Sequence, residues 1–328
     1  MHDMTGESGN RLLKVGRKPS RLPLARLMRN IIRYRVLLLM MAPATILLIL
    51  VKYLPMFGVI IAFKNMNYAD GILGSEWIGL KNFEFLFNST DAWIITRNTV
   101  LYNAVFIVTT MFTAVSFAIA LNELRNRFLA KLFQSAMFFP FFLSAVVISY
   151  LVYSFLGHEN GFLNKVVFGT LDIPPIQWYN EPHYWPFILP LVNLWKGVGY
   201  SMIIYLAAII GIDEEYYEAA VIDGASKWKQ IRYITLPLIR PVIIIMFLLA
   251  VGYIFNADFG LFYQVTLNSG PIYDTTNVID TYVYRAMMTL GDFGMSSAAG
   301  LFQSSVGFLL VLGANALVRR INKDEALF

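Results

Sequence analysis

Cysteine is absent from the 328-residue chain, and charged residues make up only 14% of it. The first absence excludes a disulfide framework, a thiolate metal site and a cysteine nucleophile. The second excludes an ordinary soluble domain, in which about 25% of the residues are charged. The three histidines are too scattered to suggest a metal cluster, and no Gly-Lys pair occurs. A phosphate-binding loop of the P-loop type needs that pair, so this chain does not supply such an ATP site.

Long apolar runs are what the sequence has in excess, with 57% hydrophobic residues and a mean hydropathy of +0.58. A helix needs roughly 20 mostly apolar residues to cross about 30 Å of hydrocarbon. The stretches that reach this length are residues 36–62, 98–121, 132–156, 187–210, 240–263 and 295–318. We therefore expect an all-α membrane protein with six transmembrane helices. Its transmembrane domain covers residues 36–322, between a basic N-terminal segment at 1–35 and a short tail at 323–328.

Lysine and arginine are distributed unequally between the two sides of this topology. If the N-terminus is cytoplasmic, nineteen lie in cytoplasmic segments, five lie in outer segments, and Lys52 and Lys196 lie within spans. Cytoplasmic loops carry the excess of positive charge, so both termini are expected in the cytoplasm. The segment 1–35 is then the cytoplasmic flank of the first span rather than a nucleic-acid-binding tail. We expect contact with membrane lipid and none with nucleic acid.

Prolines indicate where the spans start or bend. Pro182 interrupts any helix that approaches the fourth span, and Pro241 fits the first turn of the fifth. Pro43 predicts a kink in the first span. The loops expected outside the membrane are rich in aromatic residues, Trp178 and Trp185 among them. Two interpretations stay open for these residues: an aromatic belt at the membrane interface, or a surface for an external partner.

The longest cytoplasmic connection, residues 211–241, is strongly patterned. Asp213 and the two glutamates after it suit the start of a helix, where the helix dipole favours negative charge. Gly224 suits the left-handed residue that ends such a helix. A second short helix is expected over about 226–233, before the chain enters the fifth span. The pattern alone is also compatible with an amphipathic loop that rests on lipid headgroups.

The spacing within this loop resembles the EAA motif of binding-protein-dependent ABC importer permeases. Glu218-Ala219-Ala220 is followed after three residues by Gly224, after nine more by Ile234, and after one more by Leu236-Pro237. Other segments are similar to sugar-type members of that family, namely Gly79 to Phe83, Leu121 to Leu124, Phe139-Pro140 with Ser144, and Ala298 to Ser304. The resemblance covers about residues 34–322. It is strongest with the LplB-like and YteP-like subgroup for complex oligosaccharides, which includes importers of alginate and pectin fragments.

The resemblance implies a type I ABC importer fold in the bacterial cytoplasmic (inner) membrane and a transport subunit that is not itself an enzyme. In this family, the EAA loop forms a coupling helix that docks in a groove of a cytosolic ATPase. The implied partners are a second homologous permease, two ATPase subunits, an extracytoplasmic solute-binding protein and the oligosaccharide. ATP and Mg²⁺ are expected on the ATPase, and no cofactor is expected in this chain. The residues that match the coupling motif are Glu218, Ala219, Ala220, Asp223, Gly224, Leu236 and Pro237.

Roles for three of these residues follow from the same resemblance. Glu218 is expected to contact the ATPase, Ala219 and Ala220 to permit its close approach, and Gly224 to set the bend between the two helices of the loop.

Polar residues within a bilayer are costly and often functional. Spans four to six carry polar and aromatic residues that suit a path for sugar: Asn193, Trp195, Lys196, Tyr253, Asn256, Asp258, Gln303 and Ser304. Structural roles remain open for several of them. Lys196 suits a buried ion pair, Asp258 suits an extension to the interface, and Ser304 suits helix packing. A cation at Lys196 favours an anionic substrate, such as a uronate oligosaccharide of the alginate type.

The composition also permits a secondary transporter driven by an ion gradient and, far less readily, a membrane-embedded enzyme. Secondary transporters usually show internal repeats and broken helices near the bilayer midplane, and the sequence shows no convincing repeat. No recognisable catalytic motif favours the enzyme. The predicted function is therefore the permease subunit of an ATP-driven oligosaccharide importer, with the ion-driven transporter as the alternative.

Overall fold

The computed structural model describes residues 30, 32–88 and 90–321. The chain divides into two units, Met1–Phe57 and Gly58–Phe328. The predicted basic segment 1–35 lies mostly outside the described residues, and the predicted tail 323–328 lies entirely outside them.

The described part of the first unit is a helical run of mostly apolar residues. Its elements are α2 (Arg35–Leu48), the π-helical stretch η1 (Ile49–Tyr53) and α3 (Leu54–Met56), and the 3-10 turns η2 (Phe57–Phe63) follow. Pro43 lies inside α2, and α2 continues past it for more than a turn. Pro55 cannot donate a backbone N–H bond, and the wider π turns lie directly before it.

Among residues 58–88 and 90–321 of the second unit, the only β structure is one short ribbon, and most of the other residues are helical. β1 (Lys64–Asn65) pairs antiparallel with β2 (Glu76–Trp77), with Lys64 opposite Trp77. The elements from the ribbon to the end of the second span are α4 (Gly71–Gly74), η3 (Lys81–Phe83), α5 (Phe85–Asn88) and α6 (Thr90–Asn122). The next elements are α7 (Arg127–Phe138), η4 (Phe139–Phe142), α8 (Ala145–Leu156), η5 (Leu163–Phe168), η6 (Trp178–Asn180), η7 (Pro182–Tyr184) and α9 (Trp185–Ile210).

The remainder of the second unit contains the patterned loop and the last two spans. Its elements are α10 (Glu214–Ile222), α11 (Lys227–Gln230), η8 (Ile231–Thr235), α12 (Leu236–Gly252), η9 (Gly260–Val265), η10 (Gly270–Ile272), α13 (Tyr273–Thr276), α14 (Ile279–Leu290) and α15 (Phe293–Ile321).

Within residues 30, 32–88 and 90–321, five helical runs are long and apolar enough to cross a membrane. They are Arg35–Phe63, Asp91–Asn122, Pro182–Ile210, Lys227–Gly252 and Phe293–Arg320. A sixth span is obtained when the bent pair Arg127–Phe142 and Ala145–Leu156 is counted as one. The predicted number of spans agrees with the structure on that count.

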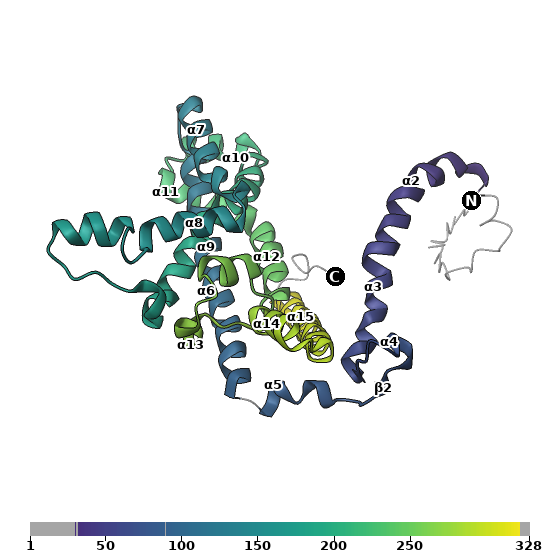
Figure 1. Ribbon diagram of the computed structural model, residues 1–328. Helices are drawn as coiled ribbons and strands as arrows, with labels where there is room; N and C mark the ends of the chain where they lie inside the picture. The colour runs from purple at the N-terminus through teal and green to yellow at the C-terminus, as the bar shows by residue number, and fades with distance from the viewer. Residues whose placement is uncertain (1–29, 31, 89, 322–328) are drawn as a thin grey trace, which may run out of the picture. The chain divides into compact units, whose positions relative to one another are not determined.

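The predicted third span, 132–156, is wrong as a single straight helix. The two halves meet at an angle of 103°, and the change of direction between α7 and α8 is visible in Figure 1. Leu143 and Ser144 have extended backbone, and Ser144 Oγ accepts a hydrogen bond from Val147 N at 3.3 Å, which caps the new helix. Pro140 contributes no backbone N–H to the preceding turn. Hydropathy does not reveal this bend, because the two halves together pass the same test for an apolar span.

The core of the second unit forms where α6 and α9 pack along each other. One buried cluster includes Tyr102, Phe106, Trp185 and Phe262, and another contains Ala114, Ala118, Met202, Tyr205 and Ile239. Small residues one helical turn apart allow two helix backbones to approach closely. The alanines at 114 and 118 of α6 have this spacing.

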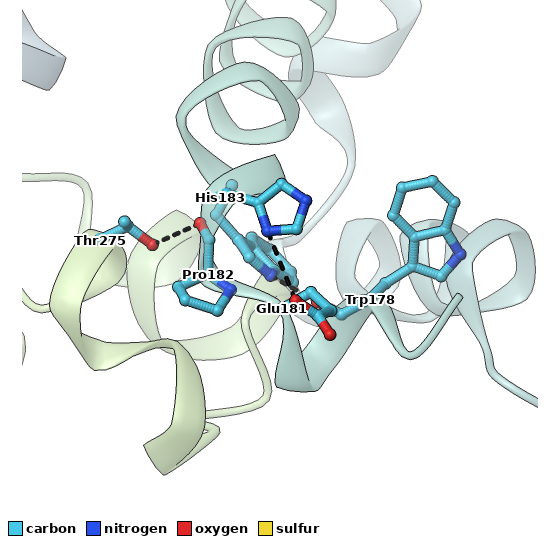
Figure 2. A network of polar contacts seen from close by, with 6 residues as sticks. Trp178, Glu181, Pro182, His183 and Thr275 are labelled. Carbon is cyan, nitrogen blue, oxygen red and sulfur yellow. Dashed lines mark hydrogen bonds and ion pairs between the residues drawn. The ribbon is translucent and has the colours of Figure 1, made fainter.

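The aromatic residues of the loop before α9 pack inside the protein. Trp178 and Trp185 are buried, and Trp185 Nε1 donates a hydrogen bond to Trp178 O at 2.8 Å. Figure 2 shows Thr275 Oγ1 donating to Pro182 O at 2.8 Å, with the exposed Glu181–His183 pair beside it. For the two tryptophans, both interpretations from sequence are therefore wrong, because burial removes them from an interface belt and from any partner surface.

The segment from Gly79 to Phe83 is hydrogen-bonded to the end of the first apolar run. Asn82 Nδ2 donates to Ala62 O at 3.0 Å and to Lys64 O at 2.9 Å. An added Cβ at Gly294, at the start of α15, would lie 2.5 Å from the same amide nitrogen. Asn82 thus fills the space between residues 61–64 and the start of the last span.

Candidate functional site

The first candidate site is the loop between α9 and α12, which folds as two helices in sequence. Asp213 Oδ1 accepts a hydrogen bond from Glu215 N at 3.1 Å and caps α10, as its position predicts. After α10 ends, Gly224 has a φ of +70°. Ala225 N then donates to Ala220 O at 2.8 Å, and Gly224 N donates to Val221 O at 3.0 Å. These bonds satisfy the last carbonyls of the helix and confirm the predicted left-handed stop.

The loop exposes large apolar side chains. Ile222 is 86% exposed and Trp228 is 69% exposed, and Tyr216, Val221 and Tyr233 are exposed as well. None of the residues of α10 is buried. The short side chains of Ala219 and Ala220 leave the backbone of this helix close to the protein surface. Exposed apolar residues gathered in one place are a mark of an interaction surface. The residues Glu218 and Asp223 of the predicted coupling motif lie on this exposed helix and at its end.

Three polar contacts hold the loop in place. Lys227 Nζ lies 3.0 Å from Glu123 Oε2 at the end of α6. Tyr217 Oη and Thr235 Oγ1 are 2.9 Å apart, and Gln230 Nε2 donates to Ala225 O at 3.1 Å. The Glu123 contact was not predicted, because about a hundred residues separate the two partners and only the Leu121–Leu124 segment hinted at a role for this position.

An open groove of about 1180 Å³ lies between the loop and the end of α6. It is lined by residues of both elements, among them Asn122, Glu123, Glu214, Tyr217, Glu218, Ile222 and Lys227. The predicted motif residues Leu236 and Pro237 lie elsewhere, at the first two positions of α12. Pro237 cannot donate a backbone N–H bond, and the wider π turns of η8 lie directly before it. Pro241 lies inside α12, so the prediction that the fifth span begins at Pro241 is wrong.

The second candidate site is a break in the fifth span. The prediction that this span continues to residue 263 is wrong, because α12 ends at Gly252 and η9 begins at Gly260. Asn103 Nδ2, from α6, donates to Ile254 O at 2.9 Å and to Asn256 O at 3.2 Å. Gln303 Nε2, from α15, donates to Phe255 O at 2.6 Å. Side-chain amides from two other helices thus replace the hydrogen bonds that the helix no longer makes.

A carboxylate from α14 completes the support of this break. Asp280 Oδ2 accepts from Ala257 N at 2.8 Å and from Gln303 Nε2 at 3.1 Å. Burial raises the pKa of Asp280, and the two hydrogen bonds act in the opposite direction. Asp280 was missed from the sequence because α14 is outside the apolar runs.

Lys196 of α9 and Asp258 of the break form an ion pair, with Nζ and Oδ2 3.1 Å apart. Asp258 Oδ1 also accepts from Leu261 N at 3.0 Å and so caps η9. The side chain of Lys196 is 24% exposed and that of Asp258 is 40% exposed. Of the two roles left open for Lys196, the structure shows the ion pair with a carboxylate. Neither side chain of the pair is fully buried.

The other predicted path residues are distributed over three environments. Tyr253 is exposed at the end of α12, and Asn256 is half-buried within the break. Gln303 is buried in its structural role. Ser304 is exposed, and its Oγ donates back to Gly300 O at 2.8 Å within α15.

Asn193, Lys196, Gly197 and Tyr200 follow a spacing that places them on one side of α9. Trp195 follows Phe187 and Leu191 at four-residue intervals, and all three are exposed. Since successive residues of an α-helix lie about 100° apart, Trp195 is on a neighbouring stripe.

Taken together, the membrane-crossing helices, the exposed two-helix loop and the supported helix break are features of a membrane transport subunit. Residues 93–323 match the model of the family described as "binding-protein-dependent transport system inner membrane component". Because the match covers more than half of the chain, the protein belongs to this family.

Similar proteins agree with that assignment. The chain is 35% identical over 301 residues to the polygalacturonan/rhamnogalacturonan transport system permease YteP of Bacillus subtilis (strain 168), covering 91% of this chain and 92% of YteP. It is 32% identical over 292 residues to protein LplB of the same strain, covering 89% and 91% of the two chains. A chain of a bacterial ABC transporter that imports the acidic polysaccharide alginate matches with a TM-score of 0.82 and 30% identity. That match covers 90% of this chain and 99% of the other.

These findings confirm the predicted class: a multi-pass inner-membrane permease of the sugar-type ABC importer family, with the type I importer fold and a transport role rather than an enzymatic one. A permease of this family works with a solute-binding protein. The break in the fifth span is therefore present in a binding-protein-dependent permease, and a broken helix does not by itself identify an ion-driven transporter.

Proposed function

We propose that this permease imports an acidic oligosaccharide of the uronate type, delivered by an extracytoplasmic solute-binding protein. The relatives support this substrate class: YteP is named for polygalacturonan and rhamnogalacturonan, and the structural neighbours for alginate. One solved neighbour is in complex with a periplasmic protein that holds an alginate pentasaccharide. The observation within this chain that carries the proposal is Lys196, a cation at mid-span that remains partly exposed beside the polar break.

The energy for import comes from two cytosolic ATPase subunits, which bind ATP and Mg²⁺, and a second homologous permease completes the path. The exposed surface of α10 and α11 suits this docking role. Glu218 contacts the ATPase, Ala219 and Ala220 permit close approach, and Gly224 fixes the bend between the two helices. Asp223 lies at the end of α10, and Leu236 and Pro237 begin α12 after the loop. The exposed side chains of Ile222 and Trp228 supply apolar area, and its transfer from water into an interface with the ATPase favours docking.

Both termini lie in the cytoplasm under this proposal. The distribution of lysine and arginine supports the orientation, because the coupling loop and both chain ends carry the positive excess. Under the same orientation, the exposed Glu181–His183 pair lies on the side of the membrane from which the solute-binding protein approaches.

Reconstitution tests the proposed function. Proteoliposomes should contain this permease, its partner permease, the ATPase and the solute-binding protein, with a trisaccharide of galacturonate as the probe. We expect uptake to require ATP on the side of the membrane that the coupling loop faces. We also expect the loaded binding protein to stimulate ATP hydrolysis. Uptake that persists without ATP and collapses when an ion gradient is dissipated would instead indicate the ion-driven transporter.

A further inference from the structure

The side of α9 that carries Lys196 has a consistent chemical character. Asn193, Lys196 and Tyr200 are spaced by three and four residues, so they follow one another along one face of the helix. Gly197 lies on the same side, and a Cβ added to it would have no heavy atom within 4 Å. At Gly199, by contrast, there is no space for a side chain, because an added Cβ would lie 2.1 Å from Met137 O. The polar face of α9 is thus open where its neighbouring face is tightly packed.

This face lies deep in the membrane. Lys196 comes eleven residues after the start of α9 and fourteen before its end, which at 1.5 Å per residue is about 17 Å and about 21 Å. Ionisable side chains at such a depth face a protein interior or a water-filled cavity. The non-helical backbone at 253–258 is under the same restriction, since it is tolerated only inside protein or beside water. Lys196 and Asp258 satisfy both conditions at one place.

An aromatic surface continues the face. The ring of Tyr200 stacks on that of Phe141 with centroids 4.8 Å apart and an interplanar angle of 12°. Both side chains are exposed. The C–H face of a pyranose ring packs well on such a surface, while its hydroxyl groups need donors and acceptors. Asn193 and the Lys196–Asp258 pair are the nearby polar groups of this face.

The two partners of the ion pair differ in what they retain when the pair opens. Asp258 keeps the hydrogen bond from Leu261 N to its other oxygen. Lys196 has a long, flexible side chain and requires an anion to replace Asp258. A sugar carboxylate supplies that anion, whereas a neutral sugar does not.

We propose that Asn193, Lys196 and Tyr200 of α9, with Asp258 of the break, form a subsite for one uronate residue, in which the carboxylate of the sugar replaces Asp258 as the partner of Lys196. This inference rests on the proposed function and assigns its specificity to named residues. Asp258 holds Lys196 in place between transport cycles and keeps the empty site electrically neutral. An acidic oligosaccharide displaces it, and a neutral one does not.

The test measures equilibrium binding of two probes to the purified transporter in nanodiscs by saturation-transfer NMR, which detects millimolar affinities without the solute-binding protein. The acidic probe is a trisaccharide of galacturonate, and its fully methyl-esterified form is the neutral probe. The principal variant is Lys196→Met with Asp258→Asn, which removes both charges and leaves none unpaired. Lys52→Met is the matched control, since it removes the other lysine located within a predicted membrane span.

We expect the double variant to bind the acidic probe about tenfold more weakly, a change of about 1.4 kcal/mol, and to bind the ester as the unaltered transporter does. The control should change neither affinity. Asp258→Asn alone retains Lys196 and removes its competitor, so it should bind the acidic probe more tightly. This single variant provides the test if the double variant does not fold.

Equal affinity of the double variant and the unaltered transporter for the acidic probe would overturn the inference. So would a parallel loss of both probes, an unaltered transporter that does not bind the acidic probe, or weaker binding of that probe to Asp258→Asn. The proposed function is judged separately by ATP-dependent uptake in the unaltered complex. If that uptake is present while the binding results go against the subsite, only the subsite is wrong.

Discussion

Replacement of Gly224 offers a sharp test of the coupling loop, because the structure separates the effect of backbone conformation from that of space. Gly224 has a φ of +70°, and a Cβ added there would have no heavy atom within 4 Å. Steric conflict with neighbours therefore contributes nothing. The cost of Gly224→Ala is the cost of placing an L-residue in the left-handed region, about 1–2 kcal/mol.

This strain should appear in docking of the ATPase. The loop is exposed and can relax when it is free, whereas a docked loop has to keep the turn between α10 and α11. Since about 1.4 kcal/mol corresponds to a factor of ten, we expect Gly224→Ala to weaken binding of the ATPase about 5- to 30-fold. Gly224→Asn should weaken it less, because asparagine tolerates the left-handed region better than alanine does.

The assay is the dissociation constant between the ATPase and the permease pair in nanodiscs, together with the rate of ATP-dependent uptake. Gly313→Ala is the matched control, since Gly313 lies within α15 and also has open space around its Cα. Alanine is favoured over glycine in a helix, so this control should leave docking unchanged. Equal docking by the glycine, asparagine and alanine forms at 224 would show that the left-handed turn is not needed for docking, and equal loss for asparagine and alanine would show that backbone strain is not its cause.

Two further predictions concern the transmembrane part. Gln303→Ala removes the amide that donates to Phe255 O, so it should lower the free energy of unfolding by about 1–3 kcal/mol. Ser304→Ala should change this free energy by less than about 0.5 kcal/mol. Thermal unfolding in detergent measures both effects, and equal effects would contradict the assigned roles. Gly199→Ala should destabilise by about 1–3 kcal/mol, because its Cβ would meet the backbone at Met137. Gly197→Ala has open space and should be tolerated, so a larger loss at 197 than at 199 in the same melting assay would show that the packing of α9 is misassigned.

The parts of the fold that local chemistry determines could be predicted from the sequence. Apolar runs located the spans, and the carboxylate at Asp213 and the glycine at 224 located both ends of α10. The bend at Ser144 could not be predicted, because the predicted stretch 132–156 is mostly apolar on both sides of it. The end of the fifth span at Gly252 was missed for a related reason: the sequence beyond it is mostly apolar, with only Asn256 and Asp258 interrupting it before residue 263, and the amides that support the break come from other helices.

The same limit applies to the candidate sites. The sequence identified Lys196 and Asp258 as unusual residues within the membrane, but sixty-two positions separate them and nothing local pairs them. Glu123 and Lys227 show the same difficulty in the coupling loop. Hydrogen-bond partners that come from distant parts of the chain are set by packing, so the sequence indicates which polar residues need partners without indicating which partners they find.

A cross-link tests whether the loop after α9 docks on a cytosolic ATPase. The natural chain has no cysteine, so Ile222→Cys places a unique thiol on the most exposed apolar position of α10. In membrane vesicles that contain the assembled transporter, we expect a short bifunctional reagent to join residue 222 to the ATPase subunit. We also expect the bound ATPase to protect the thiol from a reagent added on the cytoplasmic side. A thiol that is labelled only from the outer side, or labelled equally with and without the ATPase, would contradict it.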